Sequence, residues 1–348
     1  MNQDLTRRAF LIRAGAAAAT TVGVAAVGSK MLESASPEDV YSISNWPGTD
    51  WHLFSDSSPW VARIDKTKVD PKSDVYIKSL IDDGPPGAAG PKQLAGWGFP
   101  LYFGRARDPL YRITLRETRS RFEEEIDGKR LHAPRRMRPS NLSDSVAYVV
   151  DQTDGFTYRF QQAVIDDSER TITAWRSFRL KTYGKGFRHD KEPPTGMLPI
   201  RPEELAAGYV NHTVGLHAKC LSGHNVAPYD DSGTVGVACD DDDAQTRLSM
   251  GNVVFLDLTH KEIDALTIPT WQKAICKGLA DHGALVGFNG SGSWTLTFEA
   301  PQDRTAFGLP DPYAAAGLPS TLDYANALDE VGGWGAHLKV IAPFARPS

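Results

Sequence analysis

The sequence predicts an all-β fold with a few helices, arranged as an antiparallel β-sandwich or jelly roll. Many short runs alternate apolar and polar residues, and clusters of turn residues separate them at spacings of about 10–20 residues. No regular alternation of strand and helix patterns and no internal repeat is visible, which argues against an α/β or a repeat fold. The composition, with 41% hydrophobic and 23% charged residues, is that of a globular protein.

The first 28 residues are typical of an export signal. Arg7 and Arg8 stand directly before Ala-Phe-Leu, and an uncharged run rich in Ala and Gly extends from Ala14 to Gly28. This pattern resembles a twin-arginine signal peptide. The run is shorter than the roughly 20 residues that span a bilayer, so we expect cleavage near Gly28 and not a membrane anchor. The predicted location is therefore secreted or cell-envelope, and the protein is not expected to be an integral membrane protein.

Residues 29–96 are expected to form an irregular N-terminal segment that is rich in Ser, Pro and Asp and ends in a loop at 83–96. The β-sandwich is expected to span 97–348. The proline-rich stretch near 190–202 joins either two halves of one sandwich or two domains.

The first strands are expected at 111–117, 146–151, 157–165 and 171–180 as an antiparallel meander, with a hairpin at 122–132. Later strands are expected at 209–217, 252–258, 284–289, 293–299 and 337–341, with a hairpin turn at 290–292. Apolar residues at helical spacing predict helices at 202–207, 269–282 and 320–331.

Several segments resemble a family of secreted, β-rich proteins of actinobacteria and other soil bacteria. The resemblance rests on residues 60–65, 69–74, 76–77, 198–205, 208, 211–212, 250–251 and 280–291, followed by Trp294. It covers most of the chain after the signal. It implies a secreted β-rich protein but no defined biochemical activity.

Charge and cysteine content narrow the class of protein. The formal net charge of −5 argues against a nucleic-acid binder, because phosphate recognition needs a basic surface.

Outside the cytoplasm Cys220 and Cys239 are expected to form a disulfide, whereas Cys276 lies in a helical pattern and is expected to pack as a small hydrophobic residue. Three buried free thiols are the alternative.

The segment from 211 to 252 contains most of the candidate catalytic residues. A histidine beside carboxylates can act as a general base near neutral pH. His212, His224 and Asp230, together with Asn289, are the predicted catalytic residues if the chain brings them to one cleft. Histidines with structural hydrogen bonds are the alternative interpretation.

A run of four carboxylates follows in the same segment. Asp240, Asp241 and Asp242 are a weak candidate calcium site, because a hard cation relieves the repulsion between crowded carboxylates. The spacing is not that of a calcium-binding loop, and a solvated acidic turn is the default interpretation. We expect no required cofactor.

Aromatic content favours carbohydrate recognition. The chain has eight Trp, and sugar rings pack on aromatic faces while their hydroxyls bind polar side chains. Trp175, Asp231 and Arg247 are the predicted substrate-binding residues. The sequence contains no serine-hydrolase elbow, no phosphate-binding glycine loop and no HExxH motif.

The expected function is therefore that of an exported carbohydrate-active protein that cleaves an extracellular or cell-wall polysaccharide, as a glycoside hydrolase or a polysaccharide lyase. A non-catalytic glycan- or surface-binding protein is the first alternative. A metal or redox protein that is exported in a folded state is the second.

Overall fold

The fold is that of a computed structural model. The structure describes Trp46 and residues 51–118, 121–184, 194–226, 244–289 and 292–342. These residues belong to one compact unit, Pro37–Ser348.

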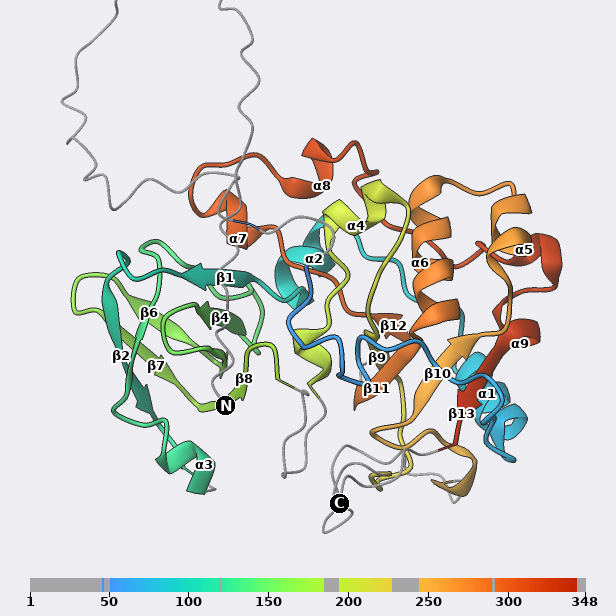
Figure 1. Cartoon of the computed structure of the whole chain (residues 1–348), viewed down its shortest axis with the longest axis horizontal. Coiled ribbons are helices and arrows are strands. Elements are labelled where there is room, and N and C mark those ends of the chain that lie inside the picture. The colour runs from blue at the N-terminus through green and yellow to red at the C-terminus, as the bar shows by residue number, and fades with distance from the viewer. Residues whose placement is uncertain are drawn as a thin grey trace, which may run out of the picture. The chain divides into compact units, whose positions relative to one another are not determined.

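The strands of the described residues form three mixed sheets (Figure 1). Sheet I has the order β12 (Thr295–Leu296), β9 (Val214–Ala218), β11 (Ala284–Asn289), β10 (Val253–Leu256) and β13 (Leu338–Ile341). Sheet II has the order β1 (Leu101–Gly104), β4 (Ala147–Asp151), β5 (Phe156–Gln161) and β8 (Arg176–Lys181). Sheet III has the order β3 (Arg130–His132), β2 (Leu110–Leu115), β7 (Thr171–Ala174) and β6 (Val164–Asp166).

The prediction of a β-rich fold is confirmed, but that of an antiparallel sandwich or jelly roll is not. Each sheet contains one parallel pair, namely β9–β11, β1–β4 and β2–β7. The predicted hairpin around 290–292 is wrong, because β11 and β12 both pair with β9, which lies between them.

Sheets II and III pack face to face as a small sandwich. Tyr102, Val149 and Phe160 of sheet II share a core with Ile113 and Ile172 of sheet III. The opposite face of sheet II belongs to a second core that it shares with sheet I. Strand β4 is consequently buried at every position, which explains its nearly continuous apolar sequence.

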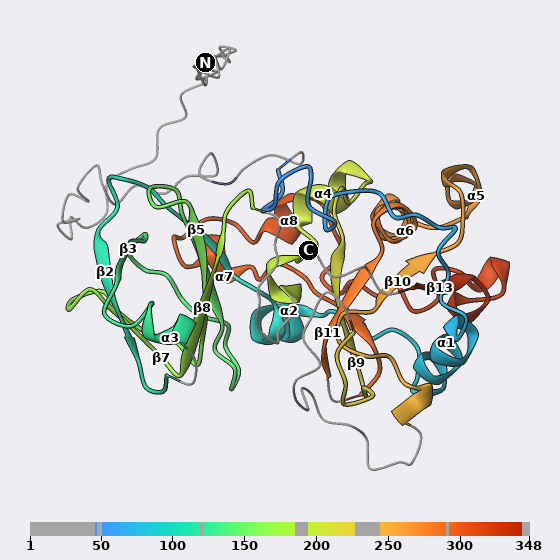
Figure 2. The ribbon, with the colours of Figure 1, turned by 60° about the horizontal axis from the view of Figure 1, so that its bottom comes forward.

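Helices cover the other face of sheet I (Figure 2). The helices of the described residues, of which α3 lies beside β8 of sheet II, are α1 (Ser73–Asp82), α2 (Pro91–Trp97), α3 (Arg121–Glu124), α4 (Pro202–Ala207), α5 (His260–Ala265), α6 (Thr270–Asp281), α7 (Gln302–Thr305), α8 (Pro312–Ala315) and α9 (Trp334–His337), with short 3₁₀ turns at Thr195–Met197, Ala244–Thr246 and Asp329–Val331. The predicted helices at 202–207 and 269–282 are confirmed as α4 and α6.

Helix α4 shows how local sequence sets the helix boundaries. Pro202 occupies the first helical turn, where a missing N–H costs nothing. The Glu204 side chain turns back to accept a hydrogen bond from the Arg201 backbone N–H at 2.9 Å. Gly208 ends the helix at φ 80°, a left-handed conformation that favours glycine.

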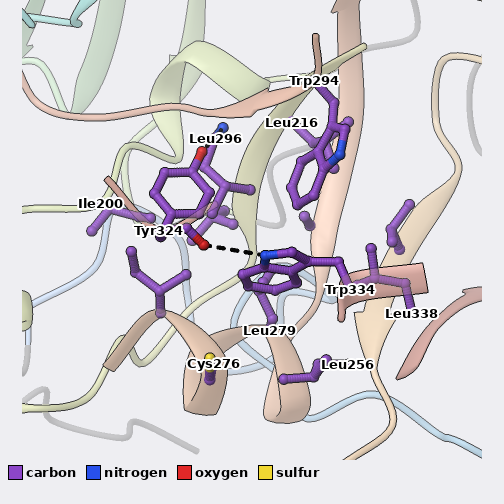
Figure 3. Close-up of a cluster of buried hydrophobic side chains, with 14 of the residues drawn as sticks. Ile200, Leu216, Leu256, Cys276, Leu279, Trp294, Leu296, Tyr324, Trp334 and Leu338 are labelled. Atoms are coloured by element: carbon purple, nitrogen blue, oxygen red, sulfur yellow. Dashed lines mark hydrogen bonds between the residues drawn. The ribbon is translucent and has the colours of Figure 1, made fainter. Parts of the chain in front are cut away.

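The core beneath α6 is rich in aromatic rings (Figure 3). Trp294 meets Trp334 edge-on with ring centroids 5.5 Å apart. The Trp334 Nε1–H donates to the backbone carbonyl of Tyr324 at 3.1 Å. Cys276 of α6 is a free, buried thiol in this core, so it packs as a small hydrophobic residue.

The segment before residue 97 is more ordered than the sequence suggests. Helices α1 and α2 both lie within it, and α1 packs against β13. Val69 forms a β-bridge with Ile341, and Ala89 forms one with Leu322. The described part of this segment therefore builds onto sheet I, and the loop predicted at 83–96 contains α2.

Candidate functional site

A cleft of about 630 Å³ lies between sheets I and II and is the candidate site. Sheet II contributes residues of β5, Val146 lines the cleft just before β4, and sheet I contributes β9, β12 and the chain that follows β12. Helix α2 and the loop before it form a third wall, and both views of the ribbon place α2 between the two sheets. The volume is in the range of small-molecule and oligomer-binding sites.

Aromatic rings connect the two sheets along the cleft. Phe99 meets the Tyr148 ring of β4 edge-on at 5.6 Å and the His217 ring of β9 at 6.1 Å. Gly98 ends α2 close to Ala300, because a Cβ there would lie 2.2 Å from the Leu94 carbonyl oxygen of α2 and 3.0 Å from the Ala300 Cα. The result is an apolar floor with rings that face in several directions.

His217 reaches the cleft because of strand alternation. Val214, Leu216 and Ala218 point into the helix-covered core of sheet I, so His217 points to the opposite face, toward sheet II. Burial lowers the pKa of His217 to about 4. The imidazole is therefore neutral at pH 7, with one ring nitrogen that can accept a proton or a hydrogen bond.

Polar side chains line the rest of the cleft. Arg159 and Gln161 project from β5, and Gln93 projects from α2. Asp144 contributes a carboxylate from an exposed residue, and Ser293 contributes a hydroxyl. These groups offer hydrogen-bond donors and acceptors around the apolar floor.

Trp97 is the large exposed side chain of the cleft. It is the last residue of α2 and keeps 49% of its surface exposed although it lines the cavity. A large aromatic ring is normally buried, so an exposed ring beside a cleft offers a flat surface for a ligand.

The predicted catalytic residue His212 lies at a different place. It is buried beside Glu204, with its Nε2 3.3 Å from Glu204 Oε1 and its Nδ1 2.7 Å from the Thr213 carbonyl oxygen. Each ring nitrogen of His212 faces an oxygen that accepts hydrogen bonds, and the side chain is buried away from the cleft. The interpretation as a structural histidine fits this geometry.

Glu204 shows the electrostatic effect of this ion pair. Burial raises the pKa of Glu204, but the charges of His212 and Arg201 more than offset that effect, and the net pKa is lowered. A small adjoining cavity of about 20 Å³, lined by His212, Arg201 and Trp51, has room for water but not for a sugar.

The other described candidates are dispersed. His224 is exposed and outside the cleft lining. Arg247 forms an ion pair with Asp83 at 2.7 Å. Trp175 lies between β7 and β8 with the Arg176 guanidinium 6.0 Å from its ring centroid, and Asn289 ends β11 opposite Ala218.

Several candidates lie outside the described residues, namely Asp230, Asp231, Cys239, Asp240, Asp241 and Asp242. The calcium site and the Cys220–Cys239 disulfide therefore stay predictions. Within the described ranges, no three His, Cys, Asp or Glu side chains are grouped in a way that could hold a metal ion.

A second polar cluster lies outside the cleft. The Arg304 guanidinium is 1% exposed and contacts Glu203 at 2.7 Å, Glu299 at 3.2 Å and Asp303 at 3.4 Å. Burial and the neighbouring Glu299 raise the pKa of Asp303 well above its ordinary value. Three carboxyl groups around one guanidinium thus favour a neutral, protonated Asp303.

Comparisons with family models, curated proteins and solved structures find no match to this chain. The helices of the described residues are all too short or too polar to cross a bilayer.

The cleft residues differ from those that the sequence singled out. Trp97, Arg159 and His217 line it, whereas His212, His224 and Trp175 do not. The sequence does carry a signal for two of these residues. In Leu216-His217-Ala218 and in Tyr158-Arg159-Phe160, one polar residue stands between two apolar residues, so the polar side chain lies on the opposite face of the strand from its neighbours. Nothing in the sequence indicates that the two strands face each other.

Proposed function

We propose that this is an exported carbohydrate-active protein that binds an extracellular or cell-wall glycan in the cleft between sheets I and II and cleaves it. The observation that carries the proposal is the combination of a large cleft, an exposed tryptophan and several hydrogen-bonding side chains over an apolar floor. Sugars have weakly polar ring faces and hydroxyl edges, so they suit a lining that mixes aromatic rings with amides, hydroxyls and a guanidinium. The twin-arginine-like signal supports a location where such polymers are found.

Elimination is the reaction that the lining favours over hydrolysis. A glycosidase of the common type uses two carboxyl groups on either side of the scissile bond. The described lining of the cleft supplies one carboxylate, Asp144, together with the neutral imidazole of His217.

A lyase needs a proton acceptor and not a second carboxylate. In such a step the acceptor takes the proton next to the sugar carboxylate, and the C–H electron pair forms a C=C bond. The glycosidic C–O bond breaks, and its oxygen leaves with a proton from water. His217 is our candidate acceptor by its position, because its unprotonated imidazole lines the cleft, although the burial that lowers its pKa to about 4 also makes it a weak base.

The direct test is incubation of the folded protein with a panel of neutral and acidic glycans. Unsaturated products, detected by ultraviolet absorbance, support elimination, whereas new reducing ends without unsaturation indicate hydrolysis. Binding without either product supports the alternative of a non-catalytic glycan-binding protein. The absence of binding to every glycan would overturn the proposal.

Two tryptophan variants locate the site. Trp97→Ala is expected to weaken glycan binding about tenfold, which corresponds to about 1.4 kcal/mol for one lost stacking contact. Trp175→Ala is the matched control, because this residue is outside the cleft lining. Loss of binding in the control but not in Trp97→Ala would place the glycan elsewhere.

A further inference from the structure

We propose that the outer face of sheet III is a second binding surface, which docks a linear acidic polysaccharide on a row of arginines. The inference goes beyond the proposed function, because this face lies on the far side of sheet II from the cleft (Figure 2). It is drawn from the strand pairing, which places like charges side by side, and from the distribution of charge along the chain.

Sheet III has one apolar face and one polar face. Along β2 exposed and buried residues alternate, and Ile113 lies in the core that sheets II and III share. Arg112 and Thr114 therefore point to the opposite, outer face. Thr171 and Thr173 of β7 pair with them in register, so their side chains lie on the same face.

Two arginines stand directly opposite each other on this face. Arg112 of β2 pairs in register with Arg130 of β3, and both residues are exposed. Side chains at such positions have Cβ atoms about 4.5–5.5 Å apart, and like charges there destabilise a sheet. None of the ion pairs of the described residues includes either guanidinium. An anion between the two side chains would relieve the repulsion, so the pair suits an anionic ligand.

Two further arginines stand at the end of this sheet in an uncommon backbone conformation. Arg136 has φ 68° and Arg170 has φ 52°, in the left-handed region that residues with a side chain rarely adopt. The Asp167 carboxylate accepts a hydrogen bond from the Arg136 N–H at 3.0 Å, and the Arg170 carbonyl accepts one from the Arg112 N–H at 2.8 Å. Strained backbone concentrates at functional positions, and here it keeps two more cations beside the start of β7.

Positive charge is concentrated in this part of the chain. Residues 105–138, which form β2, β3 and the loops around them, contain eleven Lys or Arg and six Asp or Glu, although the whole chain has a net charge of −5. Across the sheet from Arg112, the carboxylate of Asp166 is two strands away and accepts hydrogen bonds from Ser168. A polyanion is therefore attracted to this face, whereas the rest of the chain carries a net negative charge.

A linear acidic polysaccharide suits this face better than a membrane or a nucleic acid. The threonine hydroxyls beside the arginines can bind sugar hydroxyls, and a guanidinium fork matches a carboxylate or a sulfate. Peripheral membrane binding commonly uses an amphipathic helix with large apolar side chains, whereas this face is a sheet. A nucleic-acid-binding domain is commonly basic as a whole, whereas this chain is acidic.

The test compares polymers that differ in charge. Binding of alginate, hyaluronate, dextran sulfate and neutral dextran to the folded protein is measured by calorimetry. At least one acidic polymer is expected to bind about tenfold or more tightly than dextran, with an affinity that falls as salt rises. Equal affinity for all four polymers would overturn the proposal. Tighter binding of duplex DNA, or of vesicles of phosphatidylglycerol and phosphatidylcholine, than of every acidic polysaccharide would also overturn it.

Charge variants assign the binding to this face. Arg112→Gln combined with Arg130→Gln is expected to weaken the binding of acidic polymers about tenfold or more. Lys72→Gln combined with Lys261→Gln is the matched control, because it removes two exposed charges at α1 and α5 and should keep the affinity. Equal losses in the two double variants would show that only the net charge matters, and the assignment to sheet III would be wrong.

Two further arms separate this face from the cleft and from damage to the fold. Trp97→Ala, which tests the cleft, should leave the salt-dependent binding unchanged. If Trp97→Ala loses this binding and the glutamine variant keeps it, the acidic polymer binds in the cleft and the proposal is wrong. Arg112→Lys combined with Arg130→Lys keeps both charges and should retain most of the affinity. A loss as large as that of the glutamine variant would show that these charges do not hold the polymer.

Discussion

At the scale of single residues, two clusters of buried charged side chains balance their charges in different ways. Glu204 lies beside both His212 and Arg201, whose charges lower its net pKa, so Glu204 keeps its charge. Arg304 faces three carboxyl groups, and the surplus negative charge is relieved by a raised pKa at Asp303. Burial alone raises both carboxyl pKa values, so the number of nearby cations decides the outcome.

Asp303 gives the first stability prediction. A carboxyl group whose folded pKa is raised contributes stability below its unfolded pKa, and this contribution is lost as pH rises through the folded pKa. Asp303→Asn removes the titration, so we expect it to raise the free energy of unfolding at high pH by on the order of 1 kcal/mol. The gain should disappear as pH falls below the ordinary value of 3.8.

Denaturant unfolding across pH measures this difference. Asp74→Asn is the control, because the Asp74 side chain is 86% exposed and pairs with Lys339 at the surface. A loss of stability in Asp303→Asn that grows as pH rises would show that Asp303 serves as a carboxylate.

At the scale of elements, the sequence predicts what is local and misses what depends on distant partners. Helices α4 and α6 carry their own start and stop signals, so they are predicted well. The predicted helix at 320–331 is wrong. Leu322 instead bridges Ala89, and the carbonyls of Tyr324 and Ala325 accept bonds from Trp334 Nε1. Its apolar spacing fits a helix, but these distant partners fix an irregular path.

The sequence does not predict the cleft, because the cleft also depends on partners that are distant in the sequence. Arg159 and His217 are each predictable as polar residues on one face of a strand, but β5 and β9 are far apart in the sequence. Their shared cleft depends on sheet II packing against sheet I, which no local pattern encodes. Candidate sites chosen by sequence proximity, such as His212 with His224, are therefore poorly founded in this fold.

The contact between α6 and the chain after α4 gives a prediction at this scale. A Cβ on Gly278 would lie 2.7 Å from the Val210 Cβ, and both residues are buried. Gly278→Ala should therefore cost about 1–3 kcal/mol by overpacking, although alanine favours a helix. Thermal and denaturant unfolding measure the loss.

A double-mutant cycle provides the control. Val210→Ala is destabilising alone because it leaves a cavity, but combined with Gly278→Ala it should recover part of the stability. Additive losses in the double variant would show that the two side chains do not meet.

At the scale of the whole molecule, the sheets connect distant parts of the chain. In sheet I, β9 pairs in parallel with β11, and β13, the last strand of the described residues, pairs with β10. Val69 also bridges Ile341 of β13. The fold thus joins segments that are far apart in the sequence, as expected for a chain rich in long-range contacts.

These long-range contacts bear on the proposed export. The twin-arginine route generally carries proteins that are already folded, which suits a fold whose sheets join distant parts of the chain. If the proposed signal is of this type, Arg7→Lys combined with Arg8→Lys should leave the protein inside the cell in a folded, protease-resistant form, because the arginine pair is the feature that this route recognises.

Cell fractionation followed by limited proteolysis measures both properties. Arg13→Lys, which changes a nearby arginine outside the pair, is the matched control and should be exported normally. If the double variant reaches the medium or envelope as efficiently as the unchanged protein, the signal is of another type, and the link between long-range folding and the proposed export route is lost.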